Sequence, residues 1–326
     1  MVRSDRVHFK RLYPSFGRPP TGPSLEASPA HFWPFTPVPW TRYLAKPALP
    51  SLSSLLSSRL TPAGFPPEHR IALWSRLLGN PLRVTKCLFS HLLSESLLLP
   101  PAPAIWKDLR RTFPHFGHPS LRSEACLLLR AFSLFRPDVG YVQGMAYLMV
   151  FLLVLSRPYR AFKLFCGLVM GDSPLFSLFS FREREIDRVN SEMRSLMERE
   201  SPRLFSELEG RGMGVSNVLW VEWTYAMFLR TFDLESCLVL WDLAIVRRKF
   251  FIYQISCAAF RTLEKELPSL DFDHAFEQIN SCLVTQINSL IQHTLHMKDS
   301  HWDPDYQLKL NQRRIDTVLH SSLWQR

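Results

Sequence analysis

Apolar residues recur at helical spacing along most of the chain, and no stretch of useful length shows the strict alternation of a half-buried strand. Ile71, Trp74 and Leu77 form one apolar stripe, and residues 181–200 carry another whose remaining faces are charged. Leucine and phenylalanine dominate the apolar set, and 12 glycines are few for a many-turned β-sandwich. The pattern therefore predicts an all-α, multi-helix fold.

Prolines, glycines and short polar turns separate the helical stretches. The expected helices cover residues 64–80, 86–99, 105–113, 121–135, 141–156, 181–200, 201–209, 218–232, 234–246, 251–267 and 276–297. Residues 139–156 carry no charge and approach the length of a membrane span, but their continuous apolar run covers only 145–155. Because a run of that length is typical of a buried core helix, no transmembrane span is expected.

The placement of prolines divides the chain into three parts. Residues 1–60 form a Pro-rich N-terminal extension that is expected to be flexible, because its prolines forbid long helices. Residues 61–298 form the expected folded domain, and residues 299–326 a polar C-terminal tail. The N-terminus lacks the continuous apolar core of a secretory signal, but its arginine-rich composition leaves a transit peptide as an alternative.

The formal net charge of +10 favours contact with anionic surfaces, such as an acidic protein face or anionic lipid. No nucleic-acid-binding module is recognisable, so no nucleic-acid partner is expected, whereas peripheral membrane association stays open. The six cysteines are widely spaced and form no CxxC pair. They are expected to be buried free thiols in a reducing compartment.

The sequence carries no signature of an enzyme that turns over a small substrate by itself. It has no GxxxxGK[ST] loop, no GxSxG elbow and no HExxH pair. Its two HxxH pairs have no nearby carboxylate or cysteine to complete a metal site. Neither a metal ion nor a bound cofactor is therefore expected.

Two short motifs carry the candidate chemistry: IWKDLRRTFP at residues 105–114 and FRPDVGYVQGM at residues 135–145. Asp108 and Arg111 are three residues apart on one helical face, where the carboxylate can direct the guanidinium. Asp138 is placed to cap the helix that follows. Three purely structural alternatives stay open. Asp108 and Arg111 could form a plain surface ion pair, Arg110 could be the exposed arginine in place of Arg111, and Gln143 could cap a helix.

These motifs occur in a fixed order with PPEHRIALWSRLLGN before them and the Trp-Asp pair of VEWTYAMFLRTFDLESCLVLWD after them. In this order they resemble TBC domains, which are all-helical GTPase-activating domains for Rab-type small GTPases. The resemblance covers about residues 61–297 and implies a domain with two helical subdomains. It also implies a GTP-bound Rab as partner, a role in vesicle trafficking, and a cytoplasmic location with peripheral association with endomembranes.

The resemblance also assigns roles to individual residues. Arg111 would be an arginine finger and Gln143 a glutamine finger that orients the attacking water in the partner's nucleotide site. Asp108 would orient Arg111, and Gly144 would let the backbone come close beside Gln143. Tyr141 would shape the loop and contact the partner. GTP and Mg²⁺ would belong to the partner, so this chain needs no cofactor of its own.

Two other functions stay open at this point. The first is a catalytically silent TBC-like module that binds a GTPase or a scaffold without accelerating hydrolysis. The second is a basic protein that binds membrane surfaces or nucleic acid, which only the net charge supports.

Overall fold

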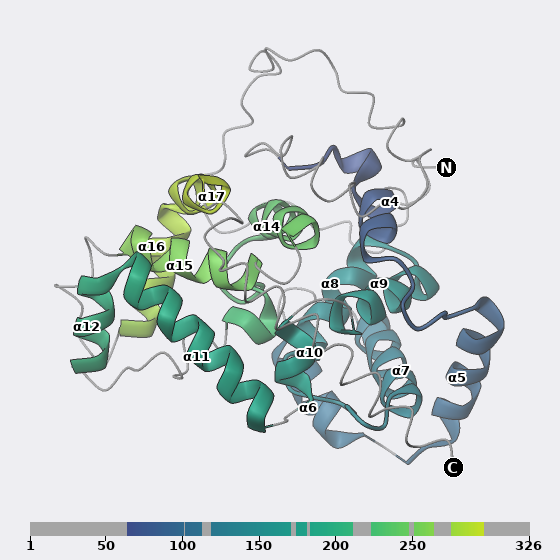
Figure 1. The fold of residues 1–326 in the computed structure, drawn as a ribbon. Helices are drawn as coiled ribbons and strands as arrows, with labels where there is room; N and C mark the ends of the chain where they lie inside the picture. The colour runs from purple at the N-terminus through teal and green to yellow at the C-terminus, as the bar shows by residue number, and fades with distance from the viewer. Residues whose placement is uncertain are drawn as a thin grey trace.

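The computed structural model describes residues 64–100, 102–112, 119–170, 174–180, 183–210, 223–247, 251–263 and 275–296. The whole predicted N-terminal extension and the whole predicted tail therefore lie outside the described residues. Within the described ranges every regular element is a helix and no strand occurs, which confirms the predicted all-α class (Figure 1).

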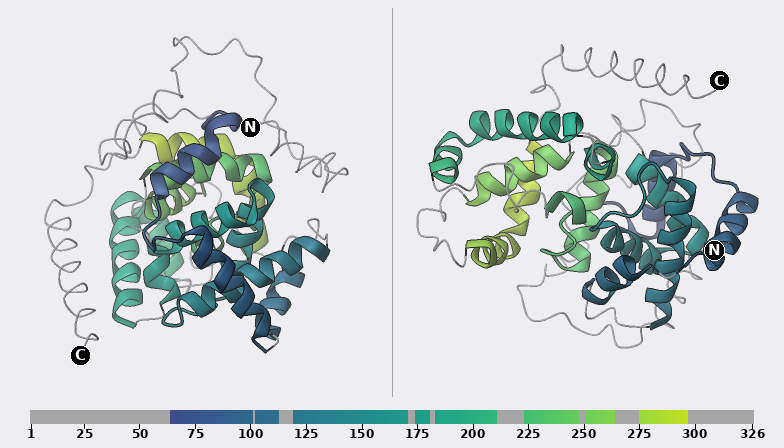
Figure 2. Two further views of the ribbon diagram at one scale, coloured as in Figure 1. Left: turned by 90° about the vertical axis from the view of Figure 1, so that its right-hand side faces the viewer. Right: turned by 90° about the horizontal axis from the view of Figure 1, so that it is seen from below.

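The helices fall into two groups, in agreement with two helical subdomains. The first group contains α4 (Pro67–Leu78), α5 (Lys86–Leu98), α6 (Pro103–Arg111), α7 (Pro119–Phe135), α8 (Met145–Leu155) and α9 (Pro158–Met170). The second contains α11 (Glu183–Glu200), α12 (Pro202–Gly210), α14 (Leu234–Arg247), α15 (Phe251–Leu263), α16 (Ala275–Thr285) and α17 (Ile287–His296). Helix α10 (Pro174–Phe179) packs against both α9 and α11 and so links the groups. The view from below in Figure 2 shows the early helices on one side and the late ones on the other.

Local sequence explains where many of these helices begin. Proline suits the first position of a helix, because its missing N–H would have no partner there and its φ is already helical. Thr85 starts α5 differently: its side chain accepts a hydrogen bond of 3.1 Å from the Leu88 amide. The helices that begin at a proline are α4, α6, α7, α9, α10 and α12.

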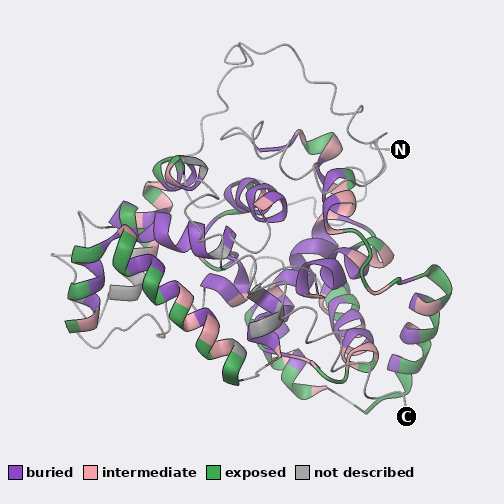
Figure 3. Cartoon of the chain, in the orientation of Figure 1, coloured by how far each residue is buried: buried purple, intermediate pink, exposed green. Residues whose placement is uncertain are grey.

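Helix α8 is the buried centre of the first group (Figure 3). Nine of its eleven residues are buried, and it packs against α6, α7 and α9. No helix within the described ranges is long and apolar enough to cross a membrane. The helix predicted from Tyr141 begins only at Met145, because Gly144 has a φ of +103° that a helix cannot contain.

A buried carboxylate joins α4 to α14. Asp242 is 0% exposed, and its oxygens accept hydrogen bonds from the Phe65 amide at 2.6 Å and from Trp74 Nε1 at 2.7 Å. Arg70 Nε donates to both Asp242 oxygens, at 3.0 and 3.1 Å. The carboxylate and these three donors are called the Asp242 clamp below. Burial raises the pKa of Asp242 to about 6, against the lowering effects of Arg70 and the other donors. The carboxylate forms an ion pair with Arg70.

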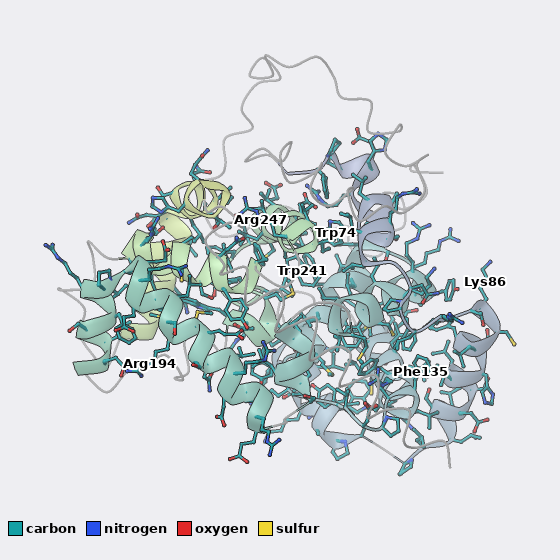
Figure 4. All side chains as sticks on the ribbon, in the orientation of Figure 1. Trp74, Lys86, Phe135, Arg194, Trp241 and Arg247 are labelled. Atoms are coloured by element: carbon teal, nitrogen blue, oxygen red, sulfur yellow. The ribbon has the colours of Figure 1, made fainter. Side chains whose placement is uncertain are left out.

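The aromatic core surrounds the Asp242 clamp. Trp241 and Trp74 are labelled in Figure 4, and their ring centroids are 5.8 Å apart. The Trp241 ring centroid also lies 4.5 Å from that of Phe151 on α8. A Cβ on Gly64 would lie 2.5 Å from Asp242 Oδ2, so the backbone at Gly64 approaches as only glycine permits. Trp241 and Asp242, the Trp-Asp pair of the sequence, thus connect α14 of the second group to α4 and α8 of the first.

Three expectations from the sequence need correction or refinement. The single helix predicted over 276–297 is interrupted at Gln286, whose amide is shared between the carbonyls of Cys282 and Leu283. The helix predicted over 218–232 is broken in its described part by positive φ angles at Met227 and Phe228. All six cysteines are free thiols as predicted, but only four of them are buried, since Cys87 is exposed and Cys282 is half-buried.

Candidate functional site

Helix α6 presents the candidate arginine. Ile105 and Leu109 are buried on its inner face and fix the helix against α7 and α8. Arg111 is its last residue, and Arg111 Nη2 donates to Asp108 Oδ1 at 2.6 Å. The Arg111 side chain is 57% exposed while that of Asp108 is 11% exposed. The carboxylate therefore restrains an arginine whose guanidinium remains accessible from outside.

Asp108 in turn is held by the second motif. The Tyr141 hydroxyl donates to Asp108 Oδ2 at 2.7 Å, so each carboxylate oxygen has its own donor. Burial, reinforced by the hydrogen bond to Asp108, raises the pKa of Tyr141, so the hydroxyl stays protonated and remains a donor. The Thr112 amide and hydroxyl both bond to the Asp108 carbonyl at 2.8 Å and close the helix behind the site.

The loop between α7 and α8 carries Gln143 and is connected to α6, the helix that carries Arg111. Gln143 is exposed, whereas Val142 and Gly144 on either side of it are buried. Residues on either side of Gln143 contact α6. The Tyr141 hydroxyl donates to Asp108, and the Tyr147 hydroxyl donates to the Arg111 carbonyl at 3.4 Å. The loop that carries Gln143 is thus connected to the helix that carries Arg111, and both of these side chains are exposed.

Neither Gln143 nor Asp138 caps helix α8. Helix α8 has Gly144 as its N-cap and no side-chain cap, so Gln143 does not cap it. The predicted capping role of Asp138 is wrong for the same reason. Asp138 instead pairs with Arg136, whose Nε and Nη2 donate to the two carboxylate oxygens at 2.7 and 2.5 Å. This ion pair stabilises the turn after α7. It directs the Asp138 carboxylate to Arg136 and not to the first amides of α8.

Gly144 is fixed by its conformation and by a close neighbour. Its φ of +103° is rarely adopted by residues with a side chain. A Cβ there would lie 3.0 Å from the Cβ of Tyr225 and 3.1 Å from the Tyr225 carbonyl oxygen. The backbone beside Gln143 is therefore pressed against the segment that contains Tyr225.

Gly144→Ala is expected to destabilise the fold by about 2–5 kcal/mol, the sum of a left-handed backbone penalty and overpacking. Gly140→Ala is the matched control, because Gly140 also has a positive φ, of 65°, but a Cβ added there would meet no atom within 4 Å. The control is expected to cost only the backbone part, about 1–2 kcal/mol. Urea denaturation of the two variants measures the difference, and equal losses would show that Tyr225 exerts no constraint.

The chemistry available to this arrangement is limited and specific. Arg111 can neutralise developing negative charge, and Gln143 can donate to and accept from a water molecule. The described ranges contain no group of His, Cys, Asp and Glu side chains that could hold a metal ion.

Sequence reasoning missed three residues of this region. Tyr147 lies within an apolar run that is typical of core positions, yet its hydroxyl reaches α6. Arg230 places its guanidinium carbon 5.8 Å from the Tyr147 ring centroid. Tyr225 packs on Gly144 although it is far from it in the chain. No spacing rule along the sequence could have joined these residues, because their contacts depend on how the later helices pack on the earlier ones.

Comparison with known proteins identifies the fold and the family. The model of the Rab-GTPase-TBC domain family, RabGAP-TBC, matches residues 67–268. Drainin of Dictyostelium discoideum is 26% identical over 222 residues, which cover 66% of this chain and 48% of that protein. The human ecotropic viral integration site 5 protein homolog is 24% identical over 257 residues, which cover 77% of this chain and 30% of that protein. The chain spans about half or less of the length of these relatives.

A solved structure gives the same result for the fold. The RabGAP TBC domain of a Chlamydomonas flagellar protein superposes with a TM-score of 0.66 at 20% identity, over 90% of this chain and 93% of that one. The family model extends from the first residue of α4 past the end of α15, which is more than half of the chain. The chain belongs to the RabGAP-TBC family.

Proposed function

We propose that this protein is a GTPase-activating protein for a Rab-family small GTPase. In this proposal Arg111 and Gln143 enter the nucleotide site of the GTP-bound partner, which supplies both GTP and Mg²⁺. The protein would regulate vesicle trafficking from the cytoplasmic side, through the Rab on an endomembrane. Membership of the RabGAP-TBC family supports the class of partner.

The network around Asp108 is the observation that carries the proposal. Arg111 and Tyr141 each donate to a different oxygen of Asp108, at 2.6 and 2.7 Å. Tyr141 stands two positions before the exposed Gln143. The Asp108 carboxylate therefore orients Arg111 and restrains the loop that carries Gln143. A plain surface ion pair would not need the second donor.

This geometry fits the requirements of GTP hydrolysis. The transferred phosphoryl group develops charge on its oxygens, and a water molecule must be aligned for in-line attack. An arginine supplied by another protein accelerates such reactions by about 10³–10⁵-fold. That acceleration is larger for a side chain held in place before the partner arrives, because ordering a mobile side chain on binding would reduce the gain. The charge-assisted bond to Asp108 provides this restraint.

The test is a phosphate-release screen over a panel of GTP-loaded Rab proteins, followed by the Gln143→Ala variant on any Rab that responds. We expect the maximal stimulated rate to fall about 10²–10³-fold, because one preorganised group at the reacting centre is lost. Gln292→Ala on α17 is the matched control and is expected to keep the full rate, since Gln292 is exposed in the other group of helices. A Gln143→Ala variant as active as the control would exclude the glutamine from the reaction. A panel without a responding Rab would favour a silent binding module.

A further inference from the structure

The segment from Tyr225 to Arg230, called here the 225–230 turn, contacts the loop that carries Gln143 directly and is linked to the helix that carries Arg111 through Tyr147. We propose that this turn is a positioning element that sets the distance and orientation between Arg111 and Gln143. The inference deepens the proposed function and rests on it for its kinetic consequences. Neither of the two motifs that carry Arg111 and Gln143 includes the turn, which lies within the stretch VEWTYAMFLRTFDLESCLVLWD.

The first contact of the turn is with the glutamine loop. The Tyr225 backbone lies so close to Gly144 that a Cβ on Gly144 would be 3.1 Å from the Tyr225 carbonyl oxygen. Tyr225 is itself anchored, because its hydroxyl donates to the Leu178 carbonyl at 3.2 Å and its ring lies 5.3 Å from that of Phe179. Helix α10 therefore fixes Tyr225, and Tyr225 fixes the backbone next to Gln143.

The second contact is with the arginine helix and runs through Tyr147. The Arg230 guanidinium carbon lies 5.8 Å from the Tyr147 ring centroid, within the range of a cation–π interaction. The Tyr147 hydroxyl donates to the carbonyl of Arg111 at 3.4 Å. Arg230 therefore restrains the ring whose hydroxyl holds the last residue of α6. The same turn thus acts on both fingers.

The turn is rigid enough for this role. Met227 and Phe228 have φ angles of 45° and 62°, which residues with large side chains rarely adopt. Both side chains are buried, and Trp241 Nε1 donates to the Met227 carbonyl at 3.3 Å. Such strained conformations persist only where the surroundings enforce them, and they concentrate at functional sites. Trp241 precedes the clamp residue Asp242, so the core between the two groups of helices also supports the turn.

The kinetic test compares Arg230→Ala, Arg230→Lys and Tyr147→Leu in single-turnover hydrolysis on a responding Rab. A positioning role predicts that Arg230→Ala and Tyr147→Leu lower the maximal stimulated rate about 10-fold or more, because small misplacements of catalytic groups are costly. The half-saturating concentration should stay within about twofold of the wild-type value, and Arg230→Lys should recover most of the rate. Arg203→Ala on α12 removes an exposed arginine in the other group of helices and is expected to change neither quantity.

A double variant separates positioning through Tyr147 from direct contact with the GTPase. In the Tyr147→Leu background, Arg230→Ala is expected to cause no further loss of rate, since both changes break the same chain of contacts. If Arg230→Ala instead raises only the half-saturating concentration, Arg230 binds the partner and the positioning inference is overturned. If Arg111→Ala abolishes stimulation while Arg230→Ala keeps the full rate, the proposed function stands and this inference fails.

Amide hydrogen exchange tests the turn without any GTPase. Arg230→Ala and Tyr147→Leu are expected to raise exchange several-fold at the amides of residues 109–112, where α6 ends. Arg203→Ala should leave these amides unchanged, and the midpoint of thermal unfolding should be the same for Arg203→Ala and Arg230→Ala. Unchanged exchange at residues 109–112 in both Arg230→Ala and Tyr147→Leu would overturn the inference, whatever the activity of the protein.

Discussion

Arg111→Ala is expected to abolish nearly all stimulation of GTP hydrolysis, with a loss of about 10³–10⁵-fold in the maximal rate. This corresponds to about 4–7 kcal/mol of transition-state stabilisation. The expected loss is large because no other group can replace a cation held by a buried carboxylate and directed outward. Single-turnover phosphate release at saturating activator measures it, so that weaker binding does not contribute.

The controls for this variant lie on the same helix. Arg110→Ala removes the same charge from the adjacent position, where no acidic side chain among the described residues pairs with it. Its expected effect is less than about tenfold, because Asp108 does not orient it. Arg111→Lys keeps the charge but loses the planar guanidinium, and we expect it to recover little of the rate. If Arg110→Ala lost activity while Arg111→Ala kept it, Arg110 and not Arg111 would be the arginine that enters the nucleotide site.

Asp242→Ala is expected to produce the largest loss of stability, about 3–5 kcal/mol in the free energy of unfolding. The change leaves the buried Arg70 without its counter-charge and the Trp74 and Phe65 N–H groups without an acceptor. Urea denaturation followed by circular dichroism measures the loss. The core that supports the 225–230 turn contains the same carboxylate, so the folded fraction must be measured before any activity is interpreted.

Asp233→Ala is the matched control for the Asp242 clamp. Asp233 precedes α14 and accepts a hydrogen bond of 2.7 Å from the Ser236 amide, but it is exposed. The loss of such a cap costs about 0.5–2 kcal/mol. Losses of equal size for Asp233→Ala and Asp242→Ala would mean that the buried carboxylate contributes no more than a surface cap. The assignment of Asp242 as the link between the two groups of helices would then be wrong.

The helical class and most helix positions could be predicted because they depend on local signals. Apolar spacing, prolines at the first position and the Thr85 cap act within a few residues, and α4, α5, α11 and α14 lie where the pattern places them. The break at Met227 and Phe228 could not be predicted, because the apolar sequence there favours a continuous helix. The positive φ angles are maintained by burial and by the hydrogen bond from Trp241, which are tertiary effects.

The candidate site was predictable only in part. Asp108 and Arg111 share a helical face, so their pairing follows from spacing alone. The bond from Tyr141 to Asp108 follows from no local rule, and the resemblance implied that Tyr141 shapes the loop and contacts the partner, not that it holds Asp108. Asp138 was assigned a cap from its residue type and position, but in the turn after α7 it pairs with Arg136 instead. Tyr147 and Arg230 could not be identified because their contacts join segments far apart in the sequence.

Binding to a transition-state analogue tests the central claim most directly. A Rab that responds in the screen is loaded with GDP, with or without aluminium fluoride, which mimics the transferred phosphoryl group. If Arg111 and Gln143 complete the nucleotide site, wild-type protein binds the fluoride-loaded form at least about 10²-fold more tightly than the GDP form. This preference should disappear in Arg111→Ala and persist in Arg110→Ala. Equal affinity of the wild-type protein for both forms would contradict the account, because the two side chains would then not contact the reacting group.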